Sequence, residues 1–217
     1  MNNTSKQEFS KKLLEWWKEN KQDFPWRNTK NPYKILVAEM LLRKTTAKQV
    51  NKLFEKFLLA YPTPKKLSKA THKKLVFLLK PLGMEHIRSQ QLKKMAIHIF
   101  EKYNGKIPDN EEELTKLPGI GKYSANSILS IIYHYDVPMV DVNAIRITQR
   151  VFSYESPKKR LRDDMIIWKF IEDLIPKGKS RDFNLSLIDF AHKVCLIRNP
   201  RCSSCILSVL CDYNNKK

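Results

Sequence analysis

The chain has 217 residues, with 41 Lys and Arg against 22 Asp and Glu, so its formal net charge is +19. This excess favours a polyanionic partner, because each phosphate contacted releases condensed counterions. Lysines that merely solvate helix faces are the alternative explanation. The length suffices for one large domain or two small lobes, and hydrophobic residues make up 42 % of the chain, enough to bury a sizeable core. No apolar run approaches the ~20 residues that span a bilayer, so we expect a cytoplasmic protein without a membrane contact.

Apolar residues recur at helical spacing along most of the chain. In chain order they appear first at Phe9, Leu13, Trp16 and Trp17, and then at Ile35, Ala38, Leu41 and Leu42. The same periodicity continues over residues 66–80, 86–103, 122–135, 143–153, 163–175 and 183–195. Alternating, strand-like stretches are few, and no internal repeat or long linker interrupts the pattern. The sequence therefore predicts an all-α fold.

Glycine is rare, and three of the five glycines lie in two short loops, at Gly83 and in the run Leu-Pro-Gly-Ile-Gly-Lys over 117–122. Gly119 and Gly121 allow a tight turn whose amides face outward at the start of the next helix, where the helix dipole favours an anion. Lys122 adds a positive charge there. The run predicts a phosphate-binding hairpin that follows a DNA backbone without reading its sequence. An ordinary link between two helices is the alternative.

All four cysteines lie close to the C-terminal end, in a C-x6-C-x2-C-x5-C pattern formed by Cys195, Cys202, Cys205 and Cys211. A cytosolic chain has little use for disulfides, so this clustering indicates a metal site. Four thiolates suit either zinc or a [4Fe-4S] cluster. Zinc ribbons normally present two C-x2-C pairs and this chain has one, so the wider, unequal spacing favours the cluster.

The hairpin, the later run Val-Asp-Val-Asn over 140–143 and the cysteine spacing together resemble the endonuclease III-like branch of the helix-hairpin-helix DNA glycosylases. The resemblance extends from about Phe24 to Cys211. It implies a [4Fe-4S] cluster and two lobes with DNA lying across the cleft between them. A six-helix barrel lobe ending in the hairpin would occupy residues 28–137. The cluster lobe would comprise 1–27 and 138–217, with the cluster loop at 195–211. A monovalent cation at the hairpin is a further candidate ligand.

Within this branch, the residues of the base pocket decide the activity. Bifunctional members use a lysine two residues beyond the last glycine of the hairpin to form a Schiff base and nick the strand. Tyr123 stands at that position, and Lys122 is rotated about 100° around the helix, so the resemblance implies a monofunctional enzyme. Asp141 matches the catalytic carboxylate, which would stabilise positive charge on the sugar. Without the resemblance it would be a helix N-cap. Glu39, in an otherwise apolar segment, matches the glutamate that acts on the base.

The resemblance also implies how double-stranded DNA with a mismatched or damaged base is held by a monomer. Met84 follows Gly83, where relatives insert an apolar wedge into the base stack. Arg43 or Lys44 would hydrogen-bond the orphaned guanine, although a solvated face also explains Arg43. The expected DNA contacts are Arg43, Lys44, Met84, Pro118, Gly119, Gly121, Lys122 and Asn143.

The base removed is predicted to be thymine or uracil opposite guanine. The runs 41–47 and 179–185 resemble thymine mismatch glycosylases of archaeal type, whereas adenine-removing enzymes usually carry two glutamines in place of Arg43 and Lys44. Residues 212–217 alone follow the last cysteine, and adenine enzymes normally have a further domain that recognises 8-oxoguanine. Removal of adenine opposite guanine or 8-oxoguanine is the alternative activity. A DNA-binding module without catalysis and a ferredoxin-like electron carrier are alternatives of other classes.

Overall fold

The computed structural model describes residues 3–216, and every regular element among them is a helix. The all-α class expected from the periodicity is therefore confirmed. The chain forms two compact units. The central unit is the continuous segment Asp23–Tyr133, and the terminal unit combines the two ends of the chain, Met1–Gln22 and His134–Lys217. Within the described part of the chain, no helix is long and apolar enough to cross a membrane.

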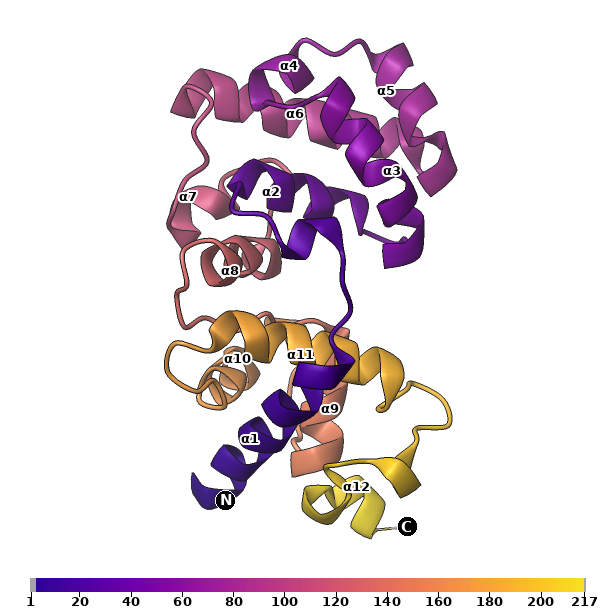
Figure 1. Ribbon diagram of the computed structural model, residues 1–217. Coiled ribbons are helices and arrows are strands. Elements are labelled where there is room, and N and C mark those ends of the chain that lie inside the picture. Colours follow the sequence, from indigo (N-terminus) through magenta and orange to yellow (C-terminus); the bar gives the residue numbers. More distant parts are fainter. Residues whose placement is uncertain (1–2, 217) are drawn as a thin grey trace. The chain divides into compact units, whose positions relative to one another are not determined.

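The central unit is built around α2, which carries Glu39 (Figure 1). Its helices are α2 (Pro32–Leu41), α3 (Ala47–Ala60), α4 (Pro64–Ser68), α5 (His72–Leu79), α6 (Glu85–Tyr103), α7 (Glu111–Thr115) and α8 (Lys122–Ile131), with 3-10 turns at Pro25–Arg27 and Lys80–Leu82. α2 packs against α3, α6 and α8, and α6 also packs against α4 and α5. Most side chains of α2 are fully buried, because the helix is apolar on nearly all sides.

Short polar residues determine where the central helices start. Thr46 forms a capping box with Gln49 at the start of α3, a helix that the expected segments leave out. Thr71 accepts a hydrogen bond from the amide of Lys74 over 3.4 Å at the start of α5. The single helix expected over 66–80 is therefore wrong. The segment divides into the end of α4 and all of α5. Thr71 has an extended backbone and is the N-cap of α5, so it separates the two helices.

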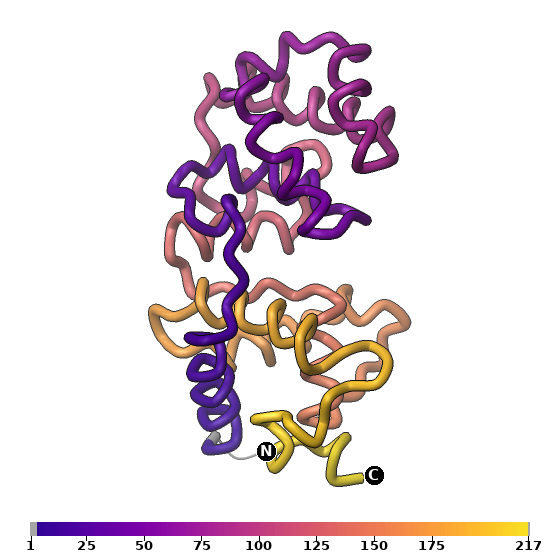
Figure 2. Tube along the Cα trace, turned by 45° about the vertical axis from the view of Figure 1, so that its right-hand side comes forward, coloured from indigo at the N-terminus to yellow at the C-terminus, as the bar shows by residue number. Residues whose placement is uncertain are grey.

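The terminal unit brings the first helix of the chain against its last third (Figure 2). Its helices are α1 (Asn3–Asn20), α9 (Val142–Phe152), α10 (Met165–Glu172), α11 (Ser180–Lys193) and α12 (Asp212–Asn215), with 3-10 turns at Leu161–Asp163, Cys202–Ser204 and Ser208–Leu210. α11 packs against both α1 and α9. The buried ring of Phe9 lies 5.0 Å from Phe152 of α9 and 6.3 Å from Phe183 of α11, centroid to centroid. This aromatic contact joins the three helices.

The buried carboxylate of Asp189 on α11 ties down the end of α1. Its Oδ2 accepts hydrogen bonds from Trp17 Nε1 over 2.8 Å and from the Gln22 amide over 3.0 Å. A buried carboxylate is tolerated when several donors satisfy it. Asp189 therefore holds the chain where it leaves the terminal unit for the central one.

Candidate active site

Glu39 is oriented within the central unit by two serines of α8. Ser127 Oγ donates to Glu39 Oε1 over 2.8 Å, and Ser124 Oγ donates to Oε2 over 3.3 Å. The two buried serines are three residues apart, so they share one face of α8. A carboxylate on an apolar helix is costly unless it has such partners. The two hydroxyls hold Glu39 in one orientation.

Arg43 contacts the hairpin. Its Nη2 donates to the backbone carbonyl of Gly119. Gly119 has a φ of +83°, and a Cβ added there would lie 3.2 Å from Arg43 Nη1 and 3.3 Å from Met40 Cε. Burial lowers the pKa of Arg43, while the charge of Glu39 acts in the opposite direction. Glycine is needed at 119 both for the backbone conformation and for the close approach of the arginine.

The second glycine of the hairpin, Gly121, is the N-cap of the ten-residue helix α8. Its backbone is extended, and a Cβ added there would meet nothing within 4 Å. Lys122 Nζ lies 3.5 Å from Glu111 Oε1, and Tyr123 is half-buried. The hairpin thus leaves open space beside the first amides of a helix, which have no partners within that helix.

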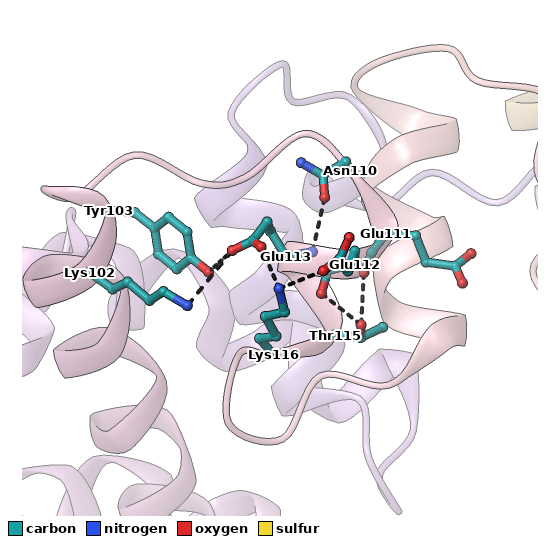
Figure 3. Close-up of polar contacts among 8 residues, drawn as sticks. All are labelled: Lys102, Tyr103, Asn110, Glu111, Glu112, Glu113, Thr115 and Lys116. Atoms are coloured by element: carbon teal, nitrogen blue, oxygen red, sulfur yellow. Dashed lines mark hydrogen bonds and ion pairs between the residues drawn. The ribbon is translucent and has the colours of Figure 1, made fainter.

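An acidic cluster on α7 precedes the hairpin (Figure 3). Glu113 accepts hydrogen bonds from Lys116 Nζ over 2.6 Å and from the Tyr103 hydroxyl over 2.5 Å. These two bonds lower the pKa of Glu113 from 4.5 to about 2. Burial and the bond to Glu113 raise the pKa of Tyr103. Because Tyr103 is the last residue of α6, the cluster links α6 to the helix that leads into the hairpin.

Two exposed side chains of the central unit stand on left-handed backbone. Met84 is the N-cap of α6, with a φ of +53° and 45 % of its surface exposed. Lys44, in the loop after α2, has a φ of +50°. Such a conformation costs about 1–3 kcal/mol for a non-glycine residue, so the surrounding structure must stabilise it. Both side chains are presented to solvent, in contrast to that of Arg43.

Asp141 begins α9 in the terminal unit. Its Oδ1 accepts hydrogen bonds from the amides of Asn143 over 2.9 Å and Ala144 over 2.8 Å. Its Oδ2 accepts one from Asn143 Nδ2 over 2.7 Å, and Asn143 Oδ1 accepts one from Arg146 Nη1 over 3.1 Å. The capping geometry is therefore present, and it leaves a half-exposed carboxylate whose orientation is set by its neighbours.

The four cysteines all line one small cavity in the terminal unit, and no disulfide joins any two of them. Among residues 3–216, no three His, Cys, Asp or Glu side chains converge on a point that would hold a single metal ion. Four cysteine thiolates around one cavity are a donor set that fits a [4Fe-4S] cluster, and four thiolates also bind zinc.

Two arginines of α9 support the cysteine loop. Arg150 Nη1 donates to the Leu196 carbonyl over 2.6 Å and lies 3.4 Å from Cys195 Sγ, while Arg146 Nε donates to the Cys195 carbonyl over 3.1 Å. Burial raises the pKa of the Cys205 thiol to about 11. Metal binding would release the thiol proton, because the thiolate is the form that binds a metal. The guanidinium beside Cys195 would offset part of the thiolate charge.

Several residues of these networks escaped the sequence analysis. Ser124 and Ser127 carried a signal, since two hydroxyls three residues apart on an apolar helix indicate a shared buried partner. Arg146 and Arg150 carried none, because both stand in an amphipathic helix of a chain rich in cations. Arg88 of α6, which lies outside these networks, is only 4 % exposed, and the pattern of neighbouring residues does not predict its burial.

A family model for base excision DNA repair proteins of the HhH-GPD superfamily matches residues 37–170, more than half of the chain. The matched segment contains Glu39, the hairpin and Asp141. The chain belongs to the HhH-GPD superfamily of base excision DNA repair proteins. The enzyme class expected from the sequence, a DNA N-glycosylase, is confirmed, and so is the expectation that the chain binds DNA.

Within this superfamily, the chain is similar to several individual DNA glycosylases. A thymine-DNA glycosylase of Aeropyrum pernix is 41 % identical over 208 residues, which cover 94 % of this chain and 93 % of that protein. A thymine/uracil-DNA glycosylase of Pyrobaculum aerophilum is 38 % identical over 213 residues, which cover 96 % of this chain and 93 % of that protein. The solved structure of a thermostable thymine-DNA glycosylase matches with a TM-score of 0.94 at 36 % identity, covering 99 % of both chains. The helix-hairpin-helix glycosylase fold expected from the motifs is confirmed.

Proposed function

We propose that this chain is a monofunctional DNA glycosylase that removes thymine or uracil mispaired with guanine, acting as a monomer on nucleoid DNA. The observation that carries the proposal is the similarity, over nearly the whole chain, to proteins named thymine- and thymine/uracil-DNA glycosylases. Arg43 and Lys44 support the proposal, because adenine-removing enzymes usually carry two glutamines at these positions.

Asp141 is the proposed catalytic carboxylate. Breaking the bond between base and sugar develops positive charge on the deoxyribose, which a fixed negative charge stabilises. The amides at the start of α9 and the Asn143 side chain hold this carboxylate in place. Both polar ends of the Asn143 amide are engaged within the protein, which favours an orienting role over the DNA contact suggested by the resemblance.

Glu39 is the proposed group that acts on the flipped base. A carboxyl group beside the base can assist its departure by proton transfer or by hydrogen bonding. Ser124 and Ser127 orient Glu39 from the helix that follows the hairpin. Tyr123, on the first turn of the same helix, lines the proposed pocket without offering an amine.

The central unit supplies the proposed DNA contacts. Pro118, Gly119, Gly121 and Lys122 would hold backbone phosphates at the start of α8, with a monovalent cation as a candidate bridge. Met84 would enter the base stack, and a G·T pair opens at lower cost than a matched pair. Lys44 is the better candidate for the orphaned guanine, because Arg43 is bonded to the hairpin.

The terminal unit would hold a [4Fe-4S] cluster on Cys195, Cys202, Cys205 and Cys211, and clusters of this kind occur in endonuclease III-like enzymes. The shared cavity and the arginine support beside Cys195 favour this assignment. The cluster would link four points of the C-terminal chain and so stabilise its fold. In this proposal, residues 28–137 form the barrel lobe, and 1–27 with 138–217 form the cluster lobe.

Base release from defined duplexes tests the proposed substrate. Single-turnover excision is measured on duplexes with G·T, G·U, G·A and 8-oxoguanine·A, with a matched duplex as control. Release of thymine or uracil should be fastest, and the matched duplex should be unchanged. Faster release of adenine would replace the proposal with adenine removal.

The state of the strand after base release tests the monofunctional assignment. Without an amine at position 123, no Schiff base should form, so borohydride should not trap an enzyme–DNA complex and the strand should stay intact until alkali is added. Tyr123→Lys places an amine there and should create some trapping, whereas Tyr123→Phe should not. Efficient trapping by the unmodified protein would contradict the assignment.

A further inference from the structure

Arg88 on α6 is a buried cation whose guanidinium contacts carbonyls at the end of α2 and in the turn that follows it. Its Nη1 donates to the carbonyls of Met40 over 2.6 Å and Leu41 over 3.1 Å, and its Nη2 donates to the Arg43 carbonyl over 2.9 Å. The last carbonyls of a helix lack partners within the helix and form the negative end of its dipole. The arginine therefore neutralises α2 where the helix ends, without the need for a carboxylate.

The segment that Arg88 holds contains the two cations suggested to contact the orphaned guanine. Arg43 extends its guanidinium to the Gly119 carbonyl in the hairpin, and Lys44 follows with a φ of +50°. Burial lowers the pKa of Arg88, and the charge of Arg43 lowers it further. A continuous set of hydrogen bonds thus runs from α6, through the end of α2, to the hairpin, entirely within the central unit.

We propose that Arg88 is a positioning residue for mismatch discrimination, and that it works through Arg43. It holds the left-handed turn that presents Lys44, and it holds the Arg43 main chain so that the side chain can support the hairpin beside the pocket of Glu39. Without Arg88, the hairpin would still contact phosphates, but the turn of Arg43 and Lys44 would sample other conformations. The inference rests on the proposed function, because it deals with discrimination between mismatched and matched DNA.

Three variants test it. Arg88→Met removes the donors at similar volume, and Arg88→Lys keeps a cation that can reach some of the carbonyls. Leu75→Ala, at a fully buried position on α5, lowers stability in the same unit at a residue outside the turn. The measurements are the ratio of affinities for G·T and matched duplexes, the melting temperature, and amide hydrogen exchange over 43–46 and 119–121 in the free protein.

Arg88→Met should lower the affinity ratio and speed exchange in both segments by about 10- to 100-fold, the range for lost hydrogen bonds to a charged group. Arg88→Lys should be intermediate. At a matched loss of melting temperature, Leu75→Ala should keep the ratio and the exchange rates of those segments. If Arg88→Met behaves like Leu75→Ala, Arg88 merely supports the core and the proposal is wrong.

A double-mutant cycle with Arg43→Met tests the route through Arg43. If Arg88 acts through Arg43, the double variant should discriminate no worse than the more impaired single variant. If the losses of discrimination in the two single variants add up in the double variant, Arg88 does not act through Arg43. If the unmodified protein fails to release thymine from G·T, the proposed function falls. The exchange rates of 119–121 in the free Arg88→Met variant would still decide whether Arg88 supports the hairpin.

Discussion

At Asp141 one carboxylate caps a helix and is also the group proposed to stabilise the developing charge on the sugar. Its hydrogen bonds come from the first amides of α9 and from Asn143, so the cap itself fixes the direction of the charge. A helix start is a rigid place for such a group, because its backbone is already held by the helix. Substitution can separate the two roles, since asparagine caps a helix nearly as well as aspartate.

Asp141→Asn should keep the fold and DNA affinity but lower single-turnover base release by about 10²- to 10⁴-fold, because the negative charge is lost. Rapid-quench excision with a parallel binding titration measures both quantities. Asp164→Asn is the matched control, since Asp164 caps α10 in the same unit and is buried against the Tyr154 hydroxyl. It should lower the melting temperature and leave excision unchanged. Near-normal excision by Asp141→Asn would move the chemistry elsewhere, with Glu39 as the next candidate.

At the scale of elements, the hairpin places the start of α8 next to an ion pair between Lys122 and Glu111. The Lys122 ammonium lies 3.5 Å from Glu111 Oε1. It is also partly exposed to solvent, where the DNA phosphates would lie. Half-exposed ion pairs of this kind are weak. DNA binding would therefore displace Glu111 at small cost, and the carboxylate would moderate the attraction of Lys122 for phosphate.

Lys122→Gln should weaken binding to matched and mismatched duplexes alike and reduce the salt slope by about 0.9, the value for one phosphate contact. Glu111→Gln should have the opposite effect on affinity, because it leaves Lys122 with more of its charge. Fluorescence anisotropy at several salt concentrations measures both variants, with the exposed Lys56→Gln on α3 as control. An altered mismatch preference at unchanged overall affinity in Lys122→Gln would contradict the role given to the hairpin.

The acidic cluster of α7 makes part of the stability depend on pH. The pKa of Glu113 is lowered from 4.5 to about 2 in the folded protein by the bonds from Lys116 and Tyr103. A lowered folded pKa contributes stability above the unfolded value, and this contribution is lost as the pH falls through the folded value. The cluster should therefore stabilise the protein at neutral pH and cease to do so between about pH 4.5 and 2.

Glu113→Gln should lower the melting temperature at pH 7, and the difference from the unmodified protein should shrink as the pH falls from 4.5 toward 2. Calorimetry across this range measures it. Glu55→Gln, at an exposed position of α3, removes the same charge and should give little difference at any pH. A Glu113→Gln difference that stayed constant down to pH 2 would show that the carboxylate does not carry the effect.

At the scale of the molecule, the terminal unit joins both ends of the chain, and its last segment contains the cysteine cavity. Arg146 and Arg150 of α9 hold that segment through the carbonyls of Cys195 and Leu196. The cysteines follow α11, which packs on α1 and α9, so ligation at the end of the chain would stabilise the whole terminal unit.

The purified protein should be yellow-brown, absorb near roughly 400 nm and contain about four irons per chain. Cys202→Ser should lose iron and melting temperature together, since ligation and folding are coupled. Ser203→Ala, beside the ligand, is the control and should keep both. Colourless protein that contains one zinc would overturn the cluster assignment.

The features predicted from the sequence are those that depend on near neighbours. The all-α class follows from apolar spacing, the capping geometry of Asp141 from the residues just after it, and the hairpin turn from Gly119, whose positive φ few other residues accept. The clustering of the cysteines predicts a shared metal site, because the chain between them is short. The break within 66–80 was missed, because the apolar pattern continues through the Thr71 cap.

The tertiary structure alone decided which distant side chains meet. Glu39 finds Ser124 and Ser127 at separations of 85 and 88 residues, and Arg43 finds Gly119 at a separation of 76. Such contacts depend on how whole helices pack, so no local pattern of charge or hydrophobicity encodes them. The same reasoning applies to Arg88, which the sequence presents as one more surface cation. Its burial against the carbonyls of α2 exists only because α6 packs across the end of that helix.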